Sequence, residues 1–366
     1  MRGAPSAVIA LWLSAMASPL NALAPGPAGG VVVCGSSNQD LIASGPRLPR
    51  AGETLMHSSF QECFGGKGAN QAVQAARLGA RVEFIGKVGR DAFGAGMRGN
   101  FVANGVGSVH VTECDGVSGV ALIAVGALER TNTVIVVPGA NFQLAPADVD
   151  AAAGAFFGAA VLLCQLEVPA AATLRALEVA NETPGCVSVL NTAPVPPEGV
   201  DDALLRAAAV VCPNEVELEL LTGVRTDTLA GAAAGVMALQ ARGAKTVLAT
   251  LGSNGALLVT PAGLQVYVPA RKVIDAIDTT GAGDSFLGGF AAFLARGAST
   301  LEAVRAATYV AARSVQRSGT QPSYPMLKDL AEIDALPPIV EPVPEPGVIF
   351  QLQADGSCTA PAGFPR

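Results

Sequence analysis

The feature that most constrains the fold is an alternation of strand-like and helix-like segments. The run VVVCGSSNQD opens the folded body with β-branched residues and breaks at a glycine. Residues 208–223 are typical of a strand, a turn and a short helix closed by Gly223, and residues 244–259 indicate two strands around a G-S-N-G turn. Such alternation predicts an α/β fold in which helices cover both faces of a mostly parallel sheet.

Two regions depart from this alternation. Residues 119–137 contain two β-rich runs with no helix between them, and the segment from about 40 to 62 is similar. Strands without a crossover helix predict a small sheet that projects from the main one and could act as a lid. Residues 336–366 include PPIVEPVPEPG and end without periodicity, so we expect a proline-rich tail there.

Composition limits the class of function. Hydrophobic residues make up 50% of the 366 residues and charged residues 14%, which excludes a disordered chain. The net charge of −7 gives no broad attraction to nucleic acid or anionic membrane, so a small-molecule partner is favoured. The seven cysteines are scattered and never in C-x-x-C spacing, which favours free thiols over a disulfide framework or a zinc site.

The first 29 residues carry a different signal. No charge occurs between Arg2 and Asp40, and AVIALWLSAMA has the length of a signal-peptide core, with small-x-small sites at AMA (15–17) and ALA (22–24). We expect a targeting segment and linker here, with a plastid favoured over the cytoplasm. An alanine-rich extension without an address is the alternative.

The segment ECFGGKGANQAV, residues 62–73, resembles a phosphate-binding loop at first sight. A P-loop needs G-x-x-x-x-G-K followed by Ser or Thr, whose hydroxyl reaches magnesium. Here Gly68 follows Lys67, and Glu62 occupies the position five before the lysine. The P-loop interpretation therefore fails.

A better phosphate site lies in DAIDTTGAGDSFLGGFAAFLARG, residues 275–297. Apolar residues recur at helical spacing from Phe286 onward, so a helix is expected to begin at about Asp284 with GAG at its N-terminus. Free amides of a first turn bind anions, and a carboxylate beside them can accept the proton of an attacking hydroxyl. The alternative is a glycine turn in which Asp284 is only an N-cap.

These motifs carry a family resemblance. DTTGAGDSF is similar to the C-terminal signature of the ribokinase family of carbohydrate kinases, which includes fructokinases and adenosine kinases, and GGKGANQAV resembles its N-terminal signature. GSSNQD, LLCQLE, NTAP, CPNEVE, TLGSNG and GTQPS follow in the family's order between residues 30 and 330. The resemblance implies a three-layer sandwich over residues 30–335, with a β-sheet lid whose strands lie within about 40–62 and 110–138.

The resemblance also implies residue roles. Asp284 would be the general base, and Gly281, Ala282 and Gly283 would form the anion hole. The sugar would be bound by Asn38, Asp40, Gly66, Lys67, Gly68, Ala69, Asn70, Glu167 and Asp284. ATP would be bound by Asn214, Thr250, Leu251, Gly252, Ser253, Asn254, Gly255 and Gly283. Without its neighbours, Lys67 would be better interpreted as a solvated surface lysine.

Two metal ions are implied in the same way. Glu217 would order the water around Mg²⁺, although two glutamates at a helix start are also typical of capping. Potassium would be bound partly through backbone carbonyls, at Asp278, Thr280, Ser314, Arg317, Gly319 and Ser323.

The implied reaction is transfer of the γ-phosphoryl group of ATP to the 5-hydroxyl of D-ribose, which gives ribose 5-phosphate. A fructokinase, a deoxyribokinase or an adenosine kinase-like enzyme is the alternative. A non-catalytic family member is disfavoured because Gly281, Gly283 and Asp284 are all present. Family members commonly pair through their lid sheets, so a homodimer is expected, with no nucleic acid partner and no membrane in the mature form.

Overall fold

The computed structural model describes residues 29–56, 58–128, 131–339 and 348–359. The expected targeting segment therefore lies outside the described residues, except for Gly29. The prolines of the expected tail at 341–346 lie outside them as well.

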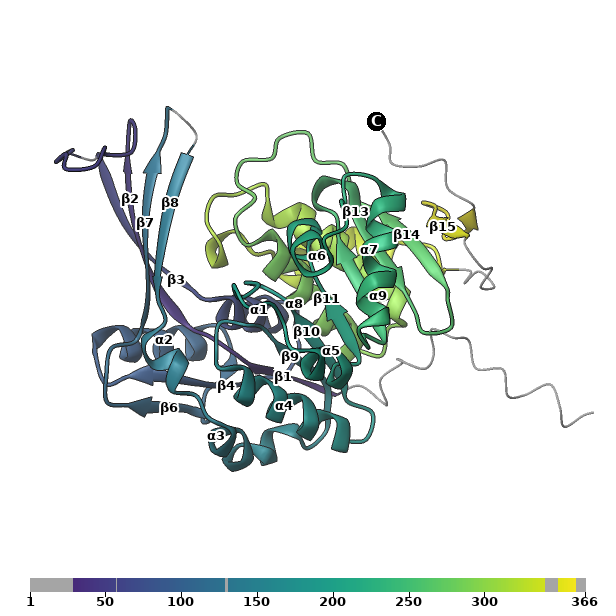
Figure 1. The fold of residues 1–366 in the computed structure, drawn as a ribbon, viewed down its shortest axis with the longest axis horizontal. Coiled ribbons are helices and arrows are strands. Elements are labelled where there is room, and N and C mark those ends of the chain that lie inside the picture. Colours follow the sequence, from purple (N-terminus) through teal and green to yellow (C-terminus); the bar gives the residue numbers. More distant parts are fainter. Residues whose placement is uncertain (1–28, 57, 129–130, 340–347, 360–366) are drawn as a thin grey trace, which may run out of the picture.

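A twelve-stranded sheet forms the centre of the molecule (Figure 1). Its strands run parallel from β12 through β11, β10, β9, β1 and β4 to β5, and β13 is antiparallel to both of its neighbours. In spatial order the strands are β16 (Cys358–Thr359), β15 (Ile349–Leu352), β14 (Gln265–Pro269), β13 (Gly255–Val259), β12 (Thr246–Thr250), β11 (Val210–Cys212), β10 (Val187–Asn191), β9 (Ala159–Cys164), β1 (Gly30–Cys34), β4 (Val82–Gly89) and β5 (Val106–Gly107), with β6 (Val111–Cys114) also paired to β4.

Helices cover both faces of this sheet, as the alternation predicted. In β1, Val31 and Val33 enter one hydrophobic core, whereas Val32 and Cys34 enter a second one on the opposite face. The first core is covered by α1 (Lys67–Arg77), α2 (Ala92–Ala103), α8 (Ala282–Ala295), α9 (Thr300–Ser314) and α10 (Ala331–Asp334). The second is covered by α3 (Pro146–Ala151), α4 (Ala170–Glu182), α5 (Asp202–Ala207), α6 (Glu215–Thr222) and α7 (Leu229–Ala241). The three-layer α/β prediction is confirmed.

A separate four-stranded sheet projects from this body (Figure 1). Its order is β3 (Ser59–Gly65), β2 (Asn38–Gly45), β7 (Gly119–Gly126) and β8 (Thr131–Val137). Strand β2 pairs in parallel with β7, and the two outer strands pair antiparallel. The strands come from the two helix-free regions of the sequence, and we call this sheet the lid.

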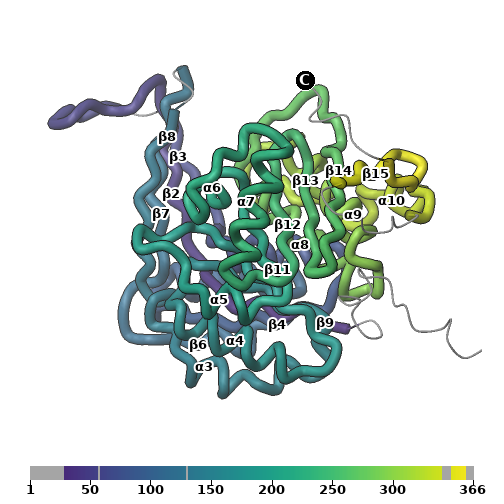
Figure 2. Tube along the Cα trace, turned by 45° about the vertical axis from the view of Figure 1, so that its right-hand side comes forward, coloured from purple at the N-terminus to yellow at the C-terminus, as the bar shows by residue number. Residues whose placement is uncertain are grey.

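The expectation of a tail after residue 336 is wrong for residues 348–359. Strand β15 pairs in parallel with β14, and β16 pairs with β15, so this segment extends the central sheet (Figure 2). Leu352 is only 4% exposed and lies in the first core. The short apolar run VIFQL was overlooked because of the prolines before it, yet it covers an edge that β14 would otherwise leave unpaired.

Within the described ranges, no helix combines the length and apolarity that a bilayer crossing requires. The apolar stretch at 151–164 is divided between the end of α3, a 3₁₀ turn at Ala153–Phe156 and β9. All seven cysteines are free, which agrees with the interpretation of their spacing.

Candidate active site

The site lies where the topology of the sheet reverses. Strands β1 and β9 are parallel neighbours, but the chain continues from β1 toward β4 and from β9 toward β10, on opposite sides. Ligands bind at such points, beyond the carboxyl ends of the strands. Glu167, in the loop after β9, joins the loop after β1 to the start of α1. Its Oε2 accepts hydrogen bonds from Ser36 Oγ at 2.5 Å and from the backbone N–H of Lys67 at 2.9 Å.

Gly66, directly before α1, and Gly68, in its first turn, allow a close approach of two backbone segments. Gly66 has φ 86°, and a Cβ there would lie 2.9 Å from the backbone nitrogen of Asn38. A Cβ on Gly68 would lie 2.7 Å from the backbone nitrogen of Ser36. Both glycines therefore pack the start of α1 against the connection between β1 and β2.

Asp284 lies inside the first turn of α8. This helix begins at Ala282, two residues earlier than expected, and Gly281 precedes it in the left-handed conformation at φ 75°. The Asp284 side chain is 8% exposed, and no side-chain cap bond is made at this helix start. The alternative of a simple Asp N-cap is therefore wrong.

Both carboxylate oxygens of Asp284 are held by amides from α1. Asn70 Nδ2 donates to Oδ2 and Gln71 Nε2 donates to Oδ1, each at 3.0 Å. The Asn70 amide also accepts a hydrogen bond from Gln321 Nε2 at 3.0 Å, so it is already engaged with protein groups on both sides. The predicted sugar loop and the predicted anion site thus meet at one carboxylate.

Gln71, which was not predicted as a site residue, is fully buried. Besides Asp284, its Nε2 contacts Asn191 Oδ1 at 3.3 Å, and its Oε1 accepts from Gln165 Nε2 at 2.6 Å. A usable signal was present in the sequence. Lys67, Asn70, Gln71 and Gln74 recur at helical spacing among alanines, which marks a polar stripe on a helix with no other polar residue before Arg77.

A cavity of about 180 Å³ opens in front of α8. It is lined by Lys67, Asn191, Ala193, Cys212, Asn214, Glu217, Thr250, Thr279, Gly281, Ala282, Gly283, Asp284 and Leu287. The cavity therefore unites Lys67 of the first signature with the second signature and with two residues expected at the nucleotide.

Lys67 does not occupy a solvated surface position. It is half-buried, which lowers its pKa, but the charges of Asp284, Glu167 and Glu217 raise that pKa by more, so the net value is above the ordinary one. The ammonium group is thus kept charged among the acids of the site.

Glu217 is both a helix cap and a wall of the cavity. Its Oε2 accepts from the backbone N–H of Asn214 and from Thr192 Oγ1, each at 3.0 Å, and burial raises its pKa. In the described part of the chain, no group of three or more His, Cys, Asp or Glu side chains could hold a metal ion. The Glu217 carboxylate on the cavity wall fits Mg²⁺, which usually keeps several waters and binds substrate phosphates.

Asn38 and Asp40 lie on lid strand β2, outside the wall of this cavity. Gly65 on β3 makes room for the Asp40 side chain, because a Cβ there would lie 2.2 Å from Asp40 Oδ2. Burial first, and then the charges of Glu167 and Asp284, raise the pKa of Asp40 to about 7. Asp40 is therefore electrostatically part of the site.

The remaining predicted residues are only partly brought together. Of the turn Thr250–Gly255, Thr250 lines the cavity, whereas the side chain of Leu251 is fully buried in the second core. Asp278 accepts from the backbone N–H of Thr280 at 2.9 Å and of Gly319 at 2.8 Å, which joins two segments of the expected potassium site. The Ser314 and Ser323 hydroxyls donate to nearby carbonyls, and Arg317 is exposed.

Comparisons with known proteins agree with this geometry. Residues 29–327 match the pfkB family of carbohydrate kinases. A mouse ribokinase is 41% identical over 309 residues, which cover 83% of this chain and 94% of the mouse protein. A Salmonella typhi deoxyribokinase is 37% identical over 304 residues, covering 82% and 97%. The structure of Arabidopsis thaliana ribokinase complexed with ribose and ATP superimposes with a TM-score of 0.76 at 30% identity, covering 84% and 98%.

Proposed function

The chain belongs to the pfkB family of carbohydrate kinases, and from this premise we propose that it is a ribokinase. It would transfer the γ-phosphoryl group of ATP to the 5-hydroxyl of D-ribose. The observation that carries the proposal is Asp284, a buried carboxylate in the first turn of a helix that faces a cavity and is held by two amides of the sugar loop. The mouse ribokinase and the Arabidopsis complex with ribose and ATP support the choice of substrates.

In this mechanism Asp284 accepts the proton of the sugar 5-hydroxyl. The freed oxygen forms a bond to the γ-phosphorus while the bond to the β–γ bridging oxygen breaks, which releases ADP. The backbone N–H groups at Gly281 and Gly283, at the start of α8, would stabilise the charge on the transferred group. The N–H of Ala282, the third residue of the expected anion hole, already donates to the Thr279 carbonyl at 3.2 Å. Lys67 supplies a positive charge on the same cavity wall.

The proposal also assigns a place to each of the two ions, Mg²⁺ and K⁺. Mg²⁺ would neutralise charge on the phosphates, with Glu217 ordering its water shell. Both oxygens of Asp278 already accept backbone N–H bonds, so K⁺ would be bound mainly by carbonyl oxygens of the segments that Asp278 joins. Potassium activation of the ATP-dependent rate, compared with sodium, tests this second assignment.

Replacement of the base tests the mechanism. Asp284→Asn keeps the shape of the side chain but cannot accept the proton, so we expect kcat to fall by about 10²- to 10⁴-fold. Ribose binding and the circular dichroism spectrum should be preserved. Asp150→Asn is the matched control, because Asp150 makes only an exposed ion pair with Arg175. Full turnover by Asp284→Asn would refute the assignment of the base.

A deoxyribokinase is the second candidate, because the Salmonella enzyme is nearly as similar as the ribokinases. A coupled ATP assay with ribose, 2-deoxyribose, fructose and adenosine separates the two. We expect the highest kcat/KM with ribose. A preference for 2-deoxyribose would replace the proposal, and an equal response to every acceptor would leave only the family.

Two further assignments belong to the proposal. A homodimer would form through the lid, because every residue of β8 is exposed. Residues 1–29 would act as an organelle address, with a plastid favoured. A fluorescent reporter fused behind residues 1–40 tests the address, since diffuse cytoplasmic fluorescence would contradict it.

A further inference from the structure

A buried amide lies at the root of the lid, where the chain passes between the two sheets. Asn141 belongs to a 3₁₀ turn, Gly139–Gln143, directly after the last lid strand, and its side chain is 1% exposed. Its Nδ2 donates to Asn38 Oδ1 at 2.8 Å and to the carbonyl of Ser37 at 3.2 Å. Its Oδ1 accepts from the backbone N–H of Ser37 at 2.9 Å. Every hydrogen-bonding atom of this amide is therefore used.

These contacts determine which group Asn38 can offer to a ligand. Asn38 Oδ1 is occupied by Asn141, so the Asn38 amide is oriented with Nδ2 as its remaining polar group. Gly119 makes room for the pair, because a Cβ there would lie 2.1 Å from Asn38 Oδ1 and 2.2 Å from Asn141 Nδ2. The neighbourhood is thus built around one orientation of Asn38.

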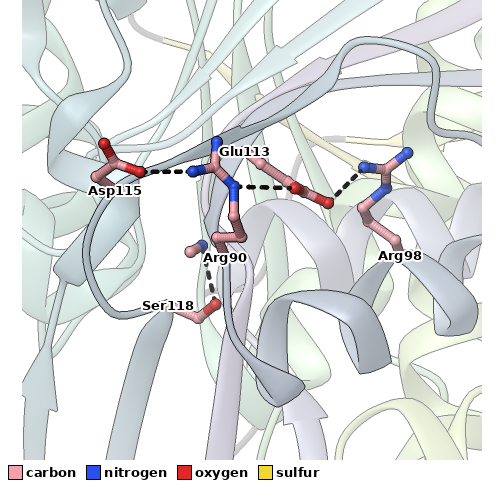
Figure 3. A network of polar contacts seen from close by, with 6 residues as sticks. Arg90, Arg98, Glu113, Asp115 and Ser118 are labelled. Carbon is pink, nitrogen blue, oxygen red and sulfur yellow. Dashed lines mark hydrogen bonds and ion pairs between the residues drawn. The ribbon is translucent and has the colours of Figure 1, made fainter.

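The lid root is also fixed by groups that do not involve Asn141. Asp91, the N-cap of α2, accepts from the Ser118 backbone N–H at 2.8 Å and from Ser118 Oγ at 2.7 Å. Figure 3 shows Ser118 Oγ accepting a further bond, which comes from the Gly89 backbone N–H at 2.9 Å.

The strand before Ser118 is held as well. Arg90 bridges Glu113 and Asp115, and Arg98 contacts Glu113 (Figure 3). Attachment of the lid therefore does not depend on Asn141 alone, and a change there should act first on Asn38.

We propose that Asn141 is a positioning residue for the sugar, which fixes Asn38 as a hydrogen-bond donor beside the carboxylate of Asp40. A sugar hydroxyl can both accept and donate a hydrogen bond. A donor and an acceptor on the same lid strand can therefore bind one hydroxyl or two neighbouring ones. This inference rests on the proposed function, because it assumes a sugar against β2. It adds a residue from a different part of the chain to the specificity of that site.

Asn141→Asp tests the inference most directly. The carboxylate can still accept from Ser37, but it cannot donate to Asn38 Oδ1, so Asn38 should turn its Nδ2 toward it and present oxygen to the sugar. We expect the ribose Kd, measured by titration calorimetry without ATP, and the ribose KM to rise about 10-fold. The KM for ATP should be unchanged. Asn141→Ser, which removes the amide without adding charge, should likewise raise the ribose Kd and KM and leave the KM for ATP unchanged.

A double-mutant cycle with Asn38→Ala separates positioning from a general structural effect. If Asn141 acts through Asn38, then adding Asn141→Asp to Asn38→Ala should change the ribose Kd by less than about 2-fold. Asn181→Asp adds the same charge on α4, away from the lid, and should behave as wild type.

Full additivity of the two substitutions, equal changes in both KM values, or unfolding of both Asn141 variants would overturn the inference. Wild-type behaviour of those variants would do so too. Failure of the proposed function is distinguishable, because the wild-type protein would then phosphorylate no ribose.

Discussion

At the scale of single residues, we expect the protonation of Asp40 to link pH to sugar binding. Its pKa of about 7 results from burial first and then from the neighbouring acids Glu167 and Asp284. Ionised Asp40 makes charge-assisted hydrogen bonds to hydroxyls, which are stronger than those of the neutral acid. Ribose affinity should therefore depend on pH within the physiological range.

We predict that the ribose KM falls as pH rises through about 7 and becomes nearly flat in this range in Asp40→Asn. Measurements of KM from pH 5.5 to 8.5 at saturating ATP check this. A wild-type profile that Asp40→Asn leaves unaltered would assign the titration to another group.

The same raised pKa affects the stability of the ligand-free protein in the opposite direction: a rise in pH should strengthen ribose binding but lower the free energy of unfolding. Between the ordinary pKa of 3.8 and about 7, the folded state retains a proton that the unfolded state has lost. The free energy of unfolding contributed by Asp40 is therefore greatest at low pH and is lost as pH rises toward 7. Comparison of urea unfolding of wild type and Asp40→Asn at pH 5 and pH 8 measures this contribution.

At the scale of elements, the two glycines at the start of α8 have different requirements. Gly281 has φ 75°, and a Cβ there would lie 2.7 Å from the Tyr324 hydroxyl, which donates to the Gly281 carbonyl at 3.1 Å. Gly283 is helical and lines the cavity, and an added Cβ would meet no atom within 4 Å apart from its chain neighbours and the nearby backbone of α8. Alanine at Gly281 should therefore strain the backbone, whereas alanine at Gly283 should only fill space beside the cavity.

We predict that Gly283→Ala unfolds at an unchanged or higher temperature, because alanine stabilises a helix by about 0.5–1 kcal/mol relative to glycine. The KM for ATP should nevertheless rise, since the methyl group borders the space assigned to the phosphates. Thermal unfolding and steady-state kinetics of the same preparation check the two effects. Wild-type KM for ATP would place the phosphates elsewhere.

The C-terminal strands are expected to contribute stability without entering the site. Leu352→Ala removes a side chain that is 4% exposed in the first core, and we predict a loss of about 2–5 kcal/mol in unfolding free energy. The KM values for ribose and ATP should not change. Leu128→Ala, at a side chain 83% exposed, is the control. An equally stable Leu352→Ala would mean that β15 adds little to the core.

Sequence patterns predicted elements better than they predicted side-chain partners. The β-branched runs and the glycine after α6 specified the strands and helices around the site, because each signal is local. Gln71 was missed because its role is to hold the Asp284 carboxylate, and Asp284 comes near only when α1 packs on α8. Asn141 was missed for the same reason, since its partners lie across the root of the lid.

At the scale of the whole molecule, the candidate site residues are divided between the central α/β body and the lid. The proposed anion hole and Glu217 lie at the starts of α8 and α6, beside the central sheet, whereas Asn38 and Asp40 lie on lid strand β2. The sugar would therefore be held between the α/β body and the lid, a sheet on which Leu122 of β7 and the valines and isoleucine of β8 are exposed. Such a sheet exposes apolar surface unless a partner covers it.

Strand β8 is the surface that we expect such a partner to cover. All seven of its residues are exposed, including Val134, Ile135, Val136 and Val137, and among the described residues β8 pairs only with β7. A long, exposed apolar edge strand is a template for association. The same strand in a second copy of the lid offers a matching apolar edge.

We predict that Ile135→Glu shifts the protein from dimer to monomer in size-exclusion chromatography with light scattering. Met237→Glu on α7, at a similarly exposed side chain, should leave the dimer intact. A wild-type protein that is monomeric at micromolar concentration would refute pairing through β8.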